Sequence, residues 1–226
     1  MNEDSPRSST GRARKFSRQA PDERRQTLIS ATLRCLAEQG AERTSIRSIC
    51  REAGVSLGLV NHHYDSKDAL IADVYEQVSN DLLATLDGAA RAAEGDARER
   101  LSAFIRASFS SVILDSGLLR VWLSFWSMTH KSRLIAEVHD RSYGAYRQTL
   151  EELLNGLARE DASQRLDARL AAIGLSGMLD GLWLEWCLNP HTFTPDEGIR
   201  LCEAFIDGLL ATGMGTGSPR QTPHRN

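Results

Sequence analysis

Apolar residues recur every three or four positions along almost the whole chain, and this helical spacing constrains the fold most. No segment shows the alternation of apolar and polar residues that indicates a β-strand. The spacing therefore predicts an all-α fold of about nine helices. The predicted helices cover residues 22–39, 45–53, 57–64, 66–93, 96–113, 116–128, 131–158, 163–188 and 195–211.

Charge divides the chain into a basic head and an acidic body. The formal net charge is −3, but residues 1–70 carry 12 basic and 9 acidic side chains, whereas the remainder carries 15 basic and 21 acidic ones. A basic head can approach phosphates while an acidic body stays away from them. The head is therefore the candidate for binding nucleic acid.

Two short predicted helices flank Gly54 in the sequence EAGVS, and this arrangement is typical of a helix-turn-helix motif. Thr44 or Ser45 can cap the first helix, and Ser56 can cap the second. In such motifs the second helix lies in the major groove of DNA, and the first crosses the backbone. We expect the second helix to face the core with Val60 and His63, together with Val55. We expect it to face DNA with Leu57, Gly58, Asn61 and His62.

The exposed side chains of this motif suit DNA chemically. Leu57 can contact a thymine methyl group, and Asn61 can bind a base edge or a phosphate. Tyr64 and Lys67 lie where the chain turns back along a phosphate strand, and the N–H groups that begin the next helix can face phosphate.

Residues 44–71, TSIRSICREAGVSLGLVNHHYDSKDALI, resemble the DNA-binding head of TetR-type repressors. The matching features are the Thr before the helix, the AGVS turn, Gly58, the His-aromatic pair at 63–64 and the SK-x-x-L sequence. Asn61 departs from the family, which usually has Tyr there. The resemblance implies binding to double-stranded DNA, with a phosphate contact from the Thr44 hydroxyl. The predicted DNA-binding residues are Thr44, Ser45, Arg47, Ser56, Leu57, Gly58, Leu59, Asn61, His62, Tyr64 and Lys67.

The resemblance and the composition together predict four segments. Residues 1–20 are expected to form a flexible basic arm, which either reaches a minor groove or is merely flexible. Residues 21–68 are expected to bind DNA, and residues 69–212 to bind a ligand and dimerise. Residues 213–226 are expected to be a disordered tail.

All four tryptophans fall in two segments of the body. RVWLSFWSMTH places Trp122, Phe125 and Trp126 on one helical face. MLDGLWLEWCLN places Asp180 and Trp183 three residues apart. Such aromatic residues are typical of a packed core or a dimer interface. They are also the components of an aromatic cage, in which ring faces hold a quaternary ammonium and a carboxylate balances its charge.

The sequences VWLSFW at 121–126 and LDGLWL at 179–184 resemble stretches of BetI-type repressors, which control choline-to-glycine-betaine genes and respond to choline. This resemblance implies a ligand pocket at Trp122, Phe125, Trp126, Asp180 and Trp183. Tyr143 and Tyr146 are further candidates. Within the same family, an aromatic drug, an acyl compound or a polyamine is the alternative effector.

The last two predicted helices resemble the dimerisation pair of the family. The run AAIGLSGMLDG is rich in small residues, which allow helices to approach closely. Glycine also lowers helix propensity by about 1 kcal/mol, so several glycines in one helix indicate a packing requirement. We therefore expect a homodimer.

The sequence argues against several other classes. It contains no G-x-S-x-G, Walker A, H-E-x-x-H or dinucleotide-binding motif, so we expect no enzyme activity and no cofactor. The cysteines, Cys35, Cys50, Cys187 and Cys202, lack metal-type spacing and are expected to be buried, and adjacent His62 and His63 cannot chelate one metal together. No membrane span or signal sequence is expected, which favours the cytoplasm. A purely structural helical adaptor stays open as an alternative.

Overall fold

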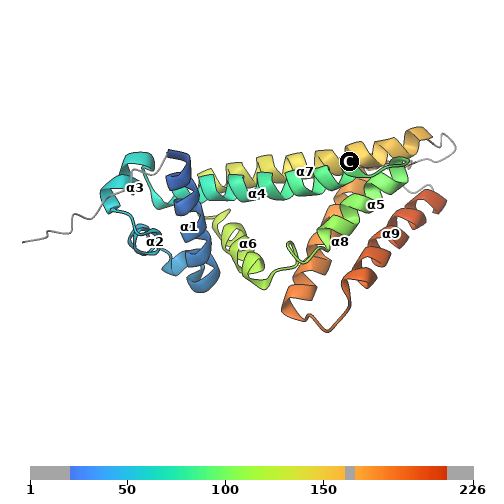
Figure 1. Cartoon of the computed structure of the whole chain (residues 1–226). Coiled ribbons are helices and arrows are strands. Elements are labelled where there is room, and N and C mark those ends of the chain that lie inside the picture. Colours follow the sequence, from blue (N-terminus) through green and yellow to red (C-terminus); the bar gives the residue numbers. More distant parts are fainter. Residues whose placement is uncertain (1–20, 161–165, 213–226) are drawn as a thin grey trace, which may run out of the picture.

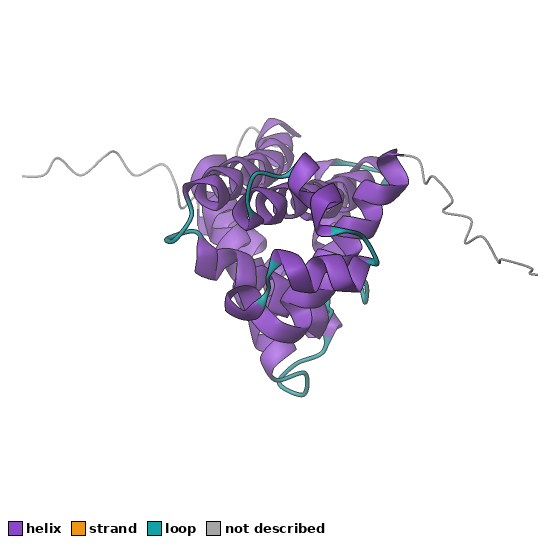
Figure 2. Cartoon of the chain, turned by 90° about the vertical axis from the view of Figure 1, so that its left-hand side faces the viewer, coloured by secondary structure: helices purple, strands orange, loops and turns teal. Residues whose placement is uncertain are grey.

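The computed structural model describes residues 21–160 and 166–212, and all regular structure in these ranges is α-helical. The all-α prediction is therefore confirmed, whereas the predicted arm and tail lie outside the described residues. Figures 1 and 2 show the arrangement of the helices. The helices are α1 (Pro21–Arg43), α2 (Ile46–Ala53), α3 (Leu57–His63), α4 (Lys67–Ala92), α5 (Ala97–Ser108), α6 (Ser116–Met128), α7 (Arg133–Glu160), α8 (Ala168–Leu188) and α9 (Pro195–Thr212).

Helices α1 to α3 form a head at one end of the molecule (Figure 1). Ser45 caps α2 through a reciprocal pair of hydrogen bonds with Ser48, and Ser56 caps α3. Gly54 ends α2 with φ 67°, a left-handed conformation that favours glycine. Gly40 has φ 72° and ψ 171° inside the span of α1, so the predicted break is present although the helical span continues to Arg43.

Helix α4 leaves the head and runs beside α7 along the length of the molecule (Figure 1). Near the head, the Tyr75 hydroxyl lies 2.7 Å from His139 Nδ1, and Arg141 pairs with Glu76. At the far end, the Glu160 carboxylate accepts the backbone N–H of Ala97, which begins α5. Helix α4 therefore contacts both the head and the body of the molecule.

Two predicted helix boundaries are wrong by about five residues. Helix α5 ends at Ser108, not near 113, because Phe109 leaves the helix and packs against Gly198 of α9, where an added Cβ would lie 2.4 Å from the ring. Helix α8 begins at Ala168, not near 163, because Asp167 caps it by accepting the backbone N–H of Leu170.

The core continues from the head into the body. It includes Leu36 and Ile49 in the head and Phe104, Phe125 and Ile135 in the body. Three cysteines are buried as predicted, but Cys187 is half-buried at the end of α8. In the described ranges, no helix is long and apolar enough to cross a membrane, and no group of side chains could hold a metal ion.

Candidate DNA-binding surface and effector cavity

Helix α3 presents its predicted DNA-facing side chains outward. Leu57 is 41% exposed, and Gly58, Asn61 and His62 are exposed beside it, whereas Val60 is fully buried. These exposed side chains are available for contact with another molecule. Arg47 on α2 is exposed as well.

The predicted orientation of His63 is wrong. His63 is exposed and lies edge-on to His62, with ring centroids 5.3 Å apart. The half-buried ring of Tyr64, four residues after Val60, packs against the core in its place. Val55 is half-buried against the core, as expected.

Three of the predicted phosphate contacts have partners within the protein. The Thr44 hydroxyl donates to the Gly40 carbonyl at 2.8 Å, and Lys67 Nζ donates to the carbonyls of Ala41 and Thr44, both at 3.2 Å. The Tyr64 hydroxyl donates to Asp73 of α4. These side chains fix the geometry of the motif, and their contact with DNA stays a prediction.

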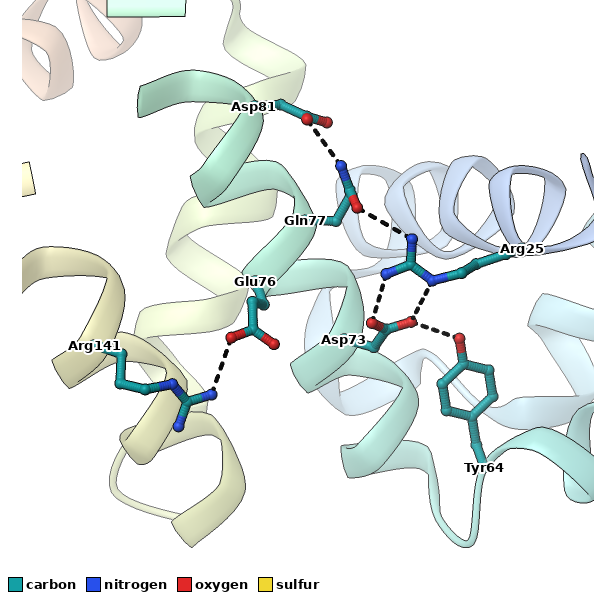
Figure 3. A network of polar contacts seen from close by, with 7 residues as sticks. All are labelled: Arg25, Tyr64, Asp73, Glu76, Gln77, Asp81 and Arg141. Carbon is teal, nitrogen blue, oxygen red and sulfur yellow. Dashed lines mark hydrogen bonds and ion pairs between the residues drawn. The ribbon is translucent and has the colours of Figure 1, made fainter. Parts of the chain in front are cut away.

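A polar network joins the motif to α1 and α4 (Figure 3). The Tyr64 hydroxyl donates to Asp73 Oδ2 at 2.6 Å, and Arg25 donates to both Asp73 oxygens, the shorter distance being 2.7 Å. Arg25 also donates to Gln77 at 3.1 Å. Burial opposes ionisation of Asp73, but the hydrogen bonds from Arg25 and Tyr64 hold its pKa below the ordinary value. Asp73 is therefore ionised, and it connects α4 to Arg25 of α1 and to Tyr64, which follows α3.

The body contains a cavity of about 80 Å³ between α4, α6, α7 and α8. Aromatic rings form much of its wall. Trp122 and Trp126 have centroids 6.2 Å apart, and Trp126 and Trp183 are 6.4 Å apart with their planes near perpendicular. The remaining wall comprises Ser79, Leu82, Leu83, Leu86, Ser108, Ile113, Leu118, Ser142, Tyr143, Tyr146, Leu179 and Asp180.

Asp180 is the acidic side chain of this cavity. Its Oδ2 accepts the Tyr143 hydroxyl at 3.2 Å. Burial raises the pKa of Asp180 to about 6, although the Tyr143 hydrogen bond and the charge of Arg147 act in the opposite direction. A half-buried carboxylate whose ionised form is partly desolvated is a favourable partner for a cation.

The predicted site residues are brought together with one exception. Trp122, Trp126, Tyr143, Asp180 and Trp183 all line the cavity. Phe125 does not, because its fully buried ring stacks on Tyr75, with centroids 4.3 Å apart and planes 9° apart.

Sequence reasoning also missed part of the wall. The cavity is also lined by three residues of α4 at spacings of three or four: Ser79, Leu82 and Leu86. The helical spacing of Leu82 and Leu86 predicts only that they lie on the apolar face of α4. No local signal distinguishes a core leucine from one that faces a cavity, because both follow the same helical spacing.

The arrangement defines a class of protein: a helix-turn-helix head for DNA on a helical body with a cavity for a small molecule. Comparison with known proteins gives the family. Residues 28–74 match the model of bacterial regulatory proteins of the tetR family, and residues 97–211 match that of the C-terminal domain of BetI-type transcriptional repressors. The chain belongs to the TetR family, with a BetI-type body, and is a DNA-binding transcriptional repressor.

Individual relatives agree with this family. The regulator BetI of Burkholderia ambifaria is 33% identical over 84% of this chain and 95% of its own length, and BetI of Paraburkholderia xenovorans is 32% identical over 84% and 94%. A transcriptional regulator from Pseudomonas aeruginosa PAO1 has a similar structure, with a TM-score of 0.83 and 53% identity over 87% of this chain and 95% of that one.

One structural neighbour contains a ligand. A regulator from Saccharomonospora viridis, solved in complex with choline, has a TM-score of 0.71 and 20% identity, covering 82% of this chain and 96% of that one. At this identity the likeness shows a shared fold. The families and relatives are transcriptional regulators, not enzymes.

Proposed function

We propose that the chain is a homodimeric repressor whose effector is choline or a related quaternary ammonium and whose targets are genes of choline and glycine betaine metabolism. The observation that carries this proposal is the aromatic cavity around Asp180. A quaternary ammonium has no N–H to donate, so aromatic ring faces and a nearby carboxylate are the groups that can hold it. Trp122, Trp126, Tyr143 and Trp183 supply those faces.

The size of the cavity favours a small cation over the alternatives. A volume of about 80 Å³ is far below the several hundred Å³ of pockets that bury drug-sized ligands. A large planar drug or a long acyl chain would require the helices to separate. The relatives named BetI and the choline complex of the Saccharomonospora protein support the same choice.

Helices α8 and α9 provide the surface for a second copy of the chain. Exposed apolar or small residues, with the half-buried Leu184 among them, follow one another on α8 at spacings of three or four: Leu170, Ile173, Gly177, Gly181, Leu184 and Leu188. An added Cβ at Gly177 or Gly181 would meet no atom within 4 Å, so a partner helix can approach there. Leu201, Ala204 and Gly208 form a similar stripe on α9. These stripes support a homodimer.

A homodimer would place two α3 helices in successive major grooves of a palindromic operator, about 34 Å apart. We propose DNA contacts from the α3 surface and its caps, and we expect the affinity to fall steeply with salt because most such contacts are to phosphates. A regulator of chromosomal genes in a bacterium acts in the cytoplasm.

A tryptophan-fluorescence titration with choline tests the effector, with sodium chloride at equal ionic strength as the control. Three of the four tryptophans line the cavity, so we expect a saturable change. Asp180→Asn should weaken binding by about tenfold or more, because it removes the charge that balances the cation. Glu185→Gln is the matched control, since Glu185 is exposed on the same helix and outside the cavity. No saturable change up to millimolar choline would refute the effector assignment.

A further inference from the structure

Some polar groups of the cavity wall have hydrogen-bond partners within the protein, and others do not. The Tyr143 hydroxyl donates to Asp180, and the Trp183 indole N–H donates to the Ile113 carbonyl at 2.9 Å. The Ser108 hydroxyl donates at 3.0 Å to a carbonyl of its own helix. The donor hydrogens of these three groups are occupied, so none of them is free to donate to an oxygen of a ligand.

Ser79 differs from these three groups. It lies on α4 in the wall of the cavity, it is 8% exposed, and its hydroxyl has no hydrogen-bond partner among the described residues. A buried hydroxyl without a partner destabilises the folded protein, so such groups are rare away from functional sites. An oxygen or N–H group of a bound molecule would satisfy it.

The indole N–H of Trp126 is a weaker candidate for the same role. It also lacks a hydrogen bond of normal geometry, but it lies close enough to the Tyr75 hydroxyl to act on the pKa of that group. Ser142 lines the cavity too, but it is only half-buried, so water can reach it. Ser79 is therefore the group on which the inference rests.

We propose that Ser79 is a specificity-determining residue that binds a hydroxyl or carbonyl oxygen carried by the effector. This inference rests on the proposed function, in which Asp180 and the aromatic rings hold the cationic end. The occupant is then an ammonium alcohol or aldehyde, and a plain tetraalkylammonium lacks the group that Ser79 requires. The same small molecule contacts α8 through Asp180 and α4 through Ser79.

The position of Ser79 gives this contact a second consequence. Ser79 lies one helical turn after Tyr75, and Asp73 on the same helix holds Tyr64 and Arg25 of the head. A hydrogen bond at Ser79 therefore acts directly on the helix that carries the head. An effector shifts a conformational equilibrium only through contacts that differ between the two states, and a contact to α4 can be one of these.

A ligand pair and a variant pair test the proposal by calorimetric titration. The ligands are choline and trimethyl(propyl)ammonium, which replaces the hydroxyl of choline by a methyl group. We expect choline to bind the native protein about five- to tenfold more tightly, in line with one neutral hydrogen bond. In Ser79→Ala this difference should disappear, whereas Ser142→Ala, the matched control in the same cavity, should retain it. Alanine is compatible with a helix at both positions.

The outcomes separate this inference from the proposed function. Equal binding of both ligands to the native protein would overturn the role of Ser79 and leave the aromatic cavity as a cation site. The proposal is overturned if Ser79→Ala still binds choline more tightly than trimethyl(propyl)ammonium, or if Ser142→Ala also loses this preference. In either case a group other than Ser79 binds the oxygen of choline. Binding of neither ligand would refute the proposed effector and the inference with it.

Discussion

The role proposed for Asp180 in binding a cation has a cost in stability. Burial raises its pKa to about 6, so near neutral pH the folded protein holds a carboxylate that has lost much of its hydration. In the unfolded chain an aspartate has a pKa of about 3.9. The folded-state pKa is the higher one, so this group stabilises the fold fully below about pH 4, and that contribution is lost as the pH rises through 6.

The pH dependence of cation binding follows from the same pKa. Below about pH 6 Asp180 is mostly protonated and offers no charge to a cation. We expect choline affinity to rise up to about tenfold per pH unit from pH 5 toward 6 and to level off above 7. Fluorescence titrations across this range measure it, and Asp180→Asn should bind weakly at every pH. An affinity that is constant from pH 5 to 8 would contradict the role of the carboxylate.

The stability of Asp180→Asn should change in the opposite direction to its affinity. At pH 7.5 the variant removes a poorly solvated charge but keeps an oxygen that accepts the Tyr143 hydroxyl. We expect its free energy of unfolding to rise by about 1–3 kcal/mol at that pH and by much less at pH 4. Urea unfolding at both pH values measures this. A loss of stability at pH 7.5 would show that the charge has a favourable partner in the fold.

Residue-level prediction succeeded where one residue type has few alternatives. Tryptophans at helical spacing with an aspartate nearby indicated most of the cavity, since an acidic side chain among large aromatic rings is costly to desolvate without a partner. It failed for Phe125, because Trp122 and Phe125 share a helical face and both contact Tyr75, and only the tertiary packing stacks Phe125 on that ring and buries it fully. Ser79 carries no sequence signal, because its role depends on three other helices.

Among the elements, α4 connects the two functions of the molecule. Its first turns hold the head through Asp73, and its middle turns line the cavity through Ser79, Leu82 and Leu86. Between them Tyr75 is fully buried, with its hydroxyl 2.7 Å from His139 of α7. These contacts lie on one continuous helix, so we expect a shift of α4 at the cavity to move the head.

Tyr64→Phe should loosen this connection. The variant removes the hydroxyl that donates to Asp73 but keeps the ring that packs against the core. We expect a loss of about 1–2 kcal/mol in stability, because the acceptor is charged and partly buried. Thermal unfolding measures the loss.

Glu76→Gln is the matched control for Tyr64→Phe. Glu76 lies on α4, as Asp73 does, and its ion pair with Arg141 of α7 is exposed (Figure 3). Exposed ion pairs contribute less than about 1 kcal/mol to stability. If both variants lose the same stability, the Asp73 network has no special role in holding the head.

Helix boundaries were predictable where a cap is encoded locally, except at α8, whose local cap Asp167 the prediction placed inside the helix. Ser45, Ser56 and Ser66 begin their helices, and Gly54 ends one, as the sequence indicated. The end of α5 was not predictable, because Phe109 continues the helical pattern and leaves the helix only to pack against Gly198 of α9. Local chemistry therefore determines caps, whereas distant packing determines the remaining ends.

At the scale of the whole molecule, the proposed dimer surface on α8 gives a test with a close control. Gly177 and Gly88 are both exposed helical glycines, and an added Cβ would meet no atom within 4 Å at either position. Arginine should therefore be tolerated by the isolated chain at both positions and should favour the helix by up to about 1 kcal/mol. We expect Gly177→Arg to be monomeric and Gly88→Arg to remain dimeric.

Light scattering coupled to size-exclusion chromatography distinguishes these masses. A dimeric Gly177→Arg would place the interface on another face of the molecule.

The central claim is that one molecule couples binding of a quaternary ammonium to binding of DNA. The most direct measurement is the fluorescence anisotropy of a labelled duplex, selected by the protein from a random-sequence pool, with and without saturating choline. We expect the selected duplex to be palindromic and choline to change its dissociation constant by about fivefold or more, with the same factor in the choline affinity of the DNA-bound protein. An unchanged dissociation constant in the presence of bound choline would contradict the claim.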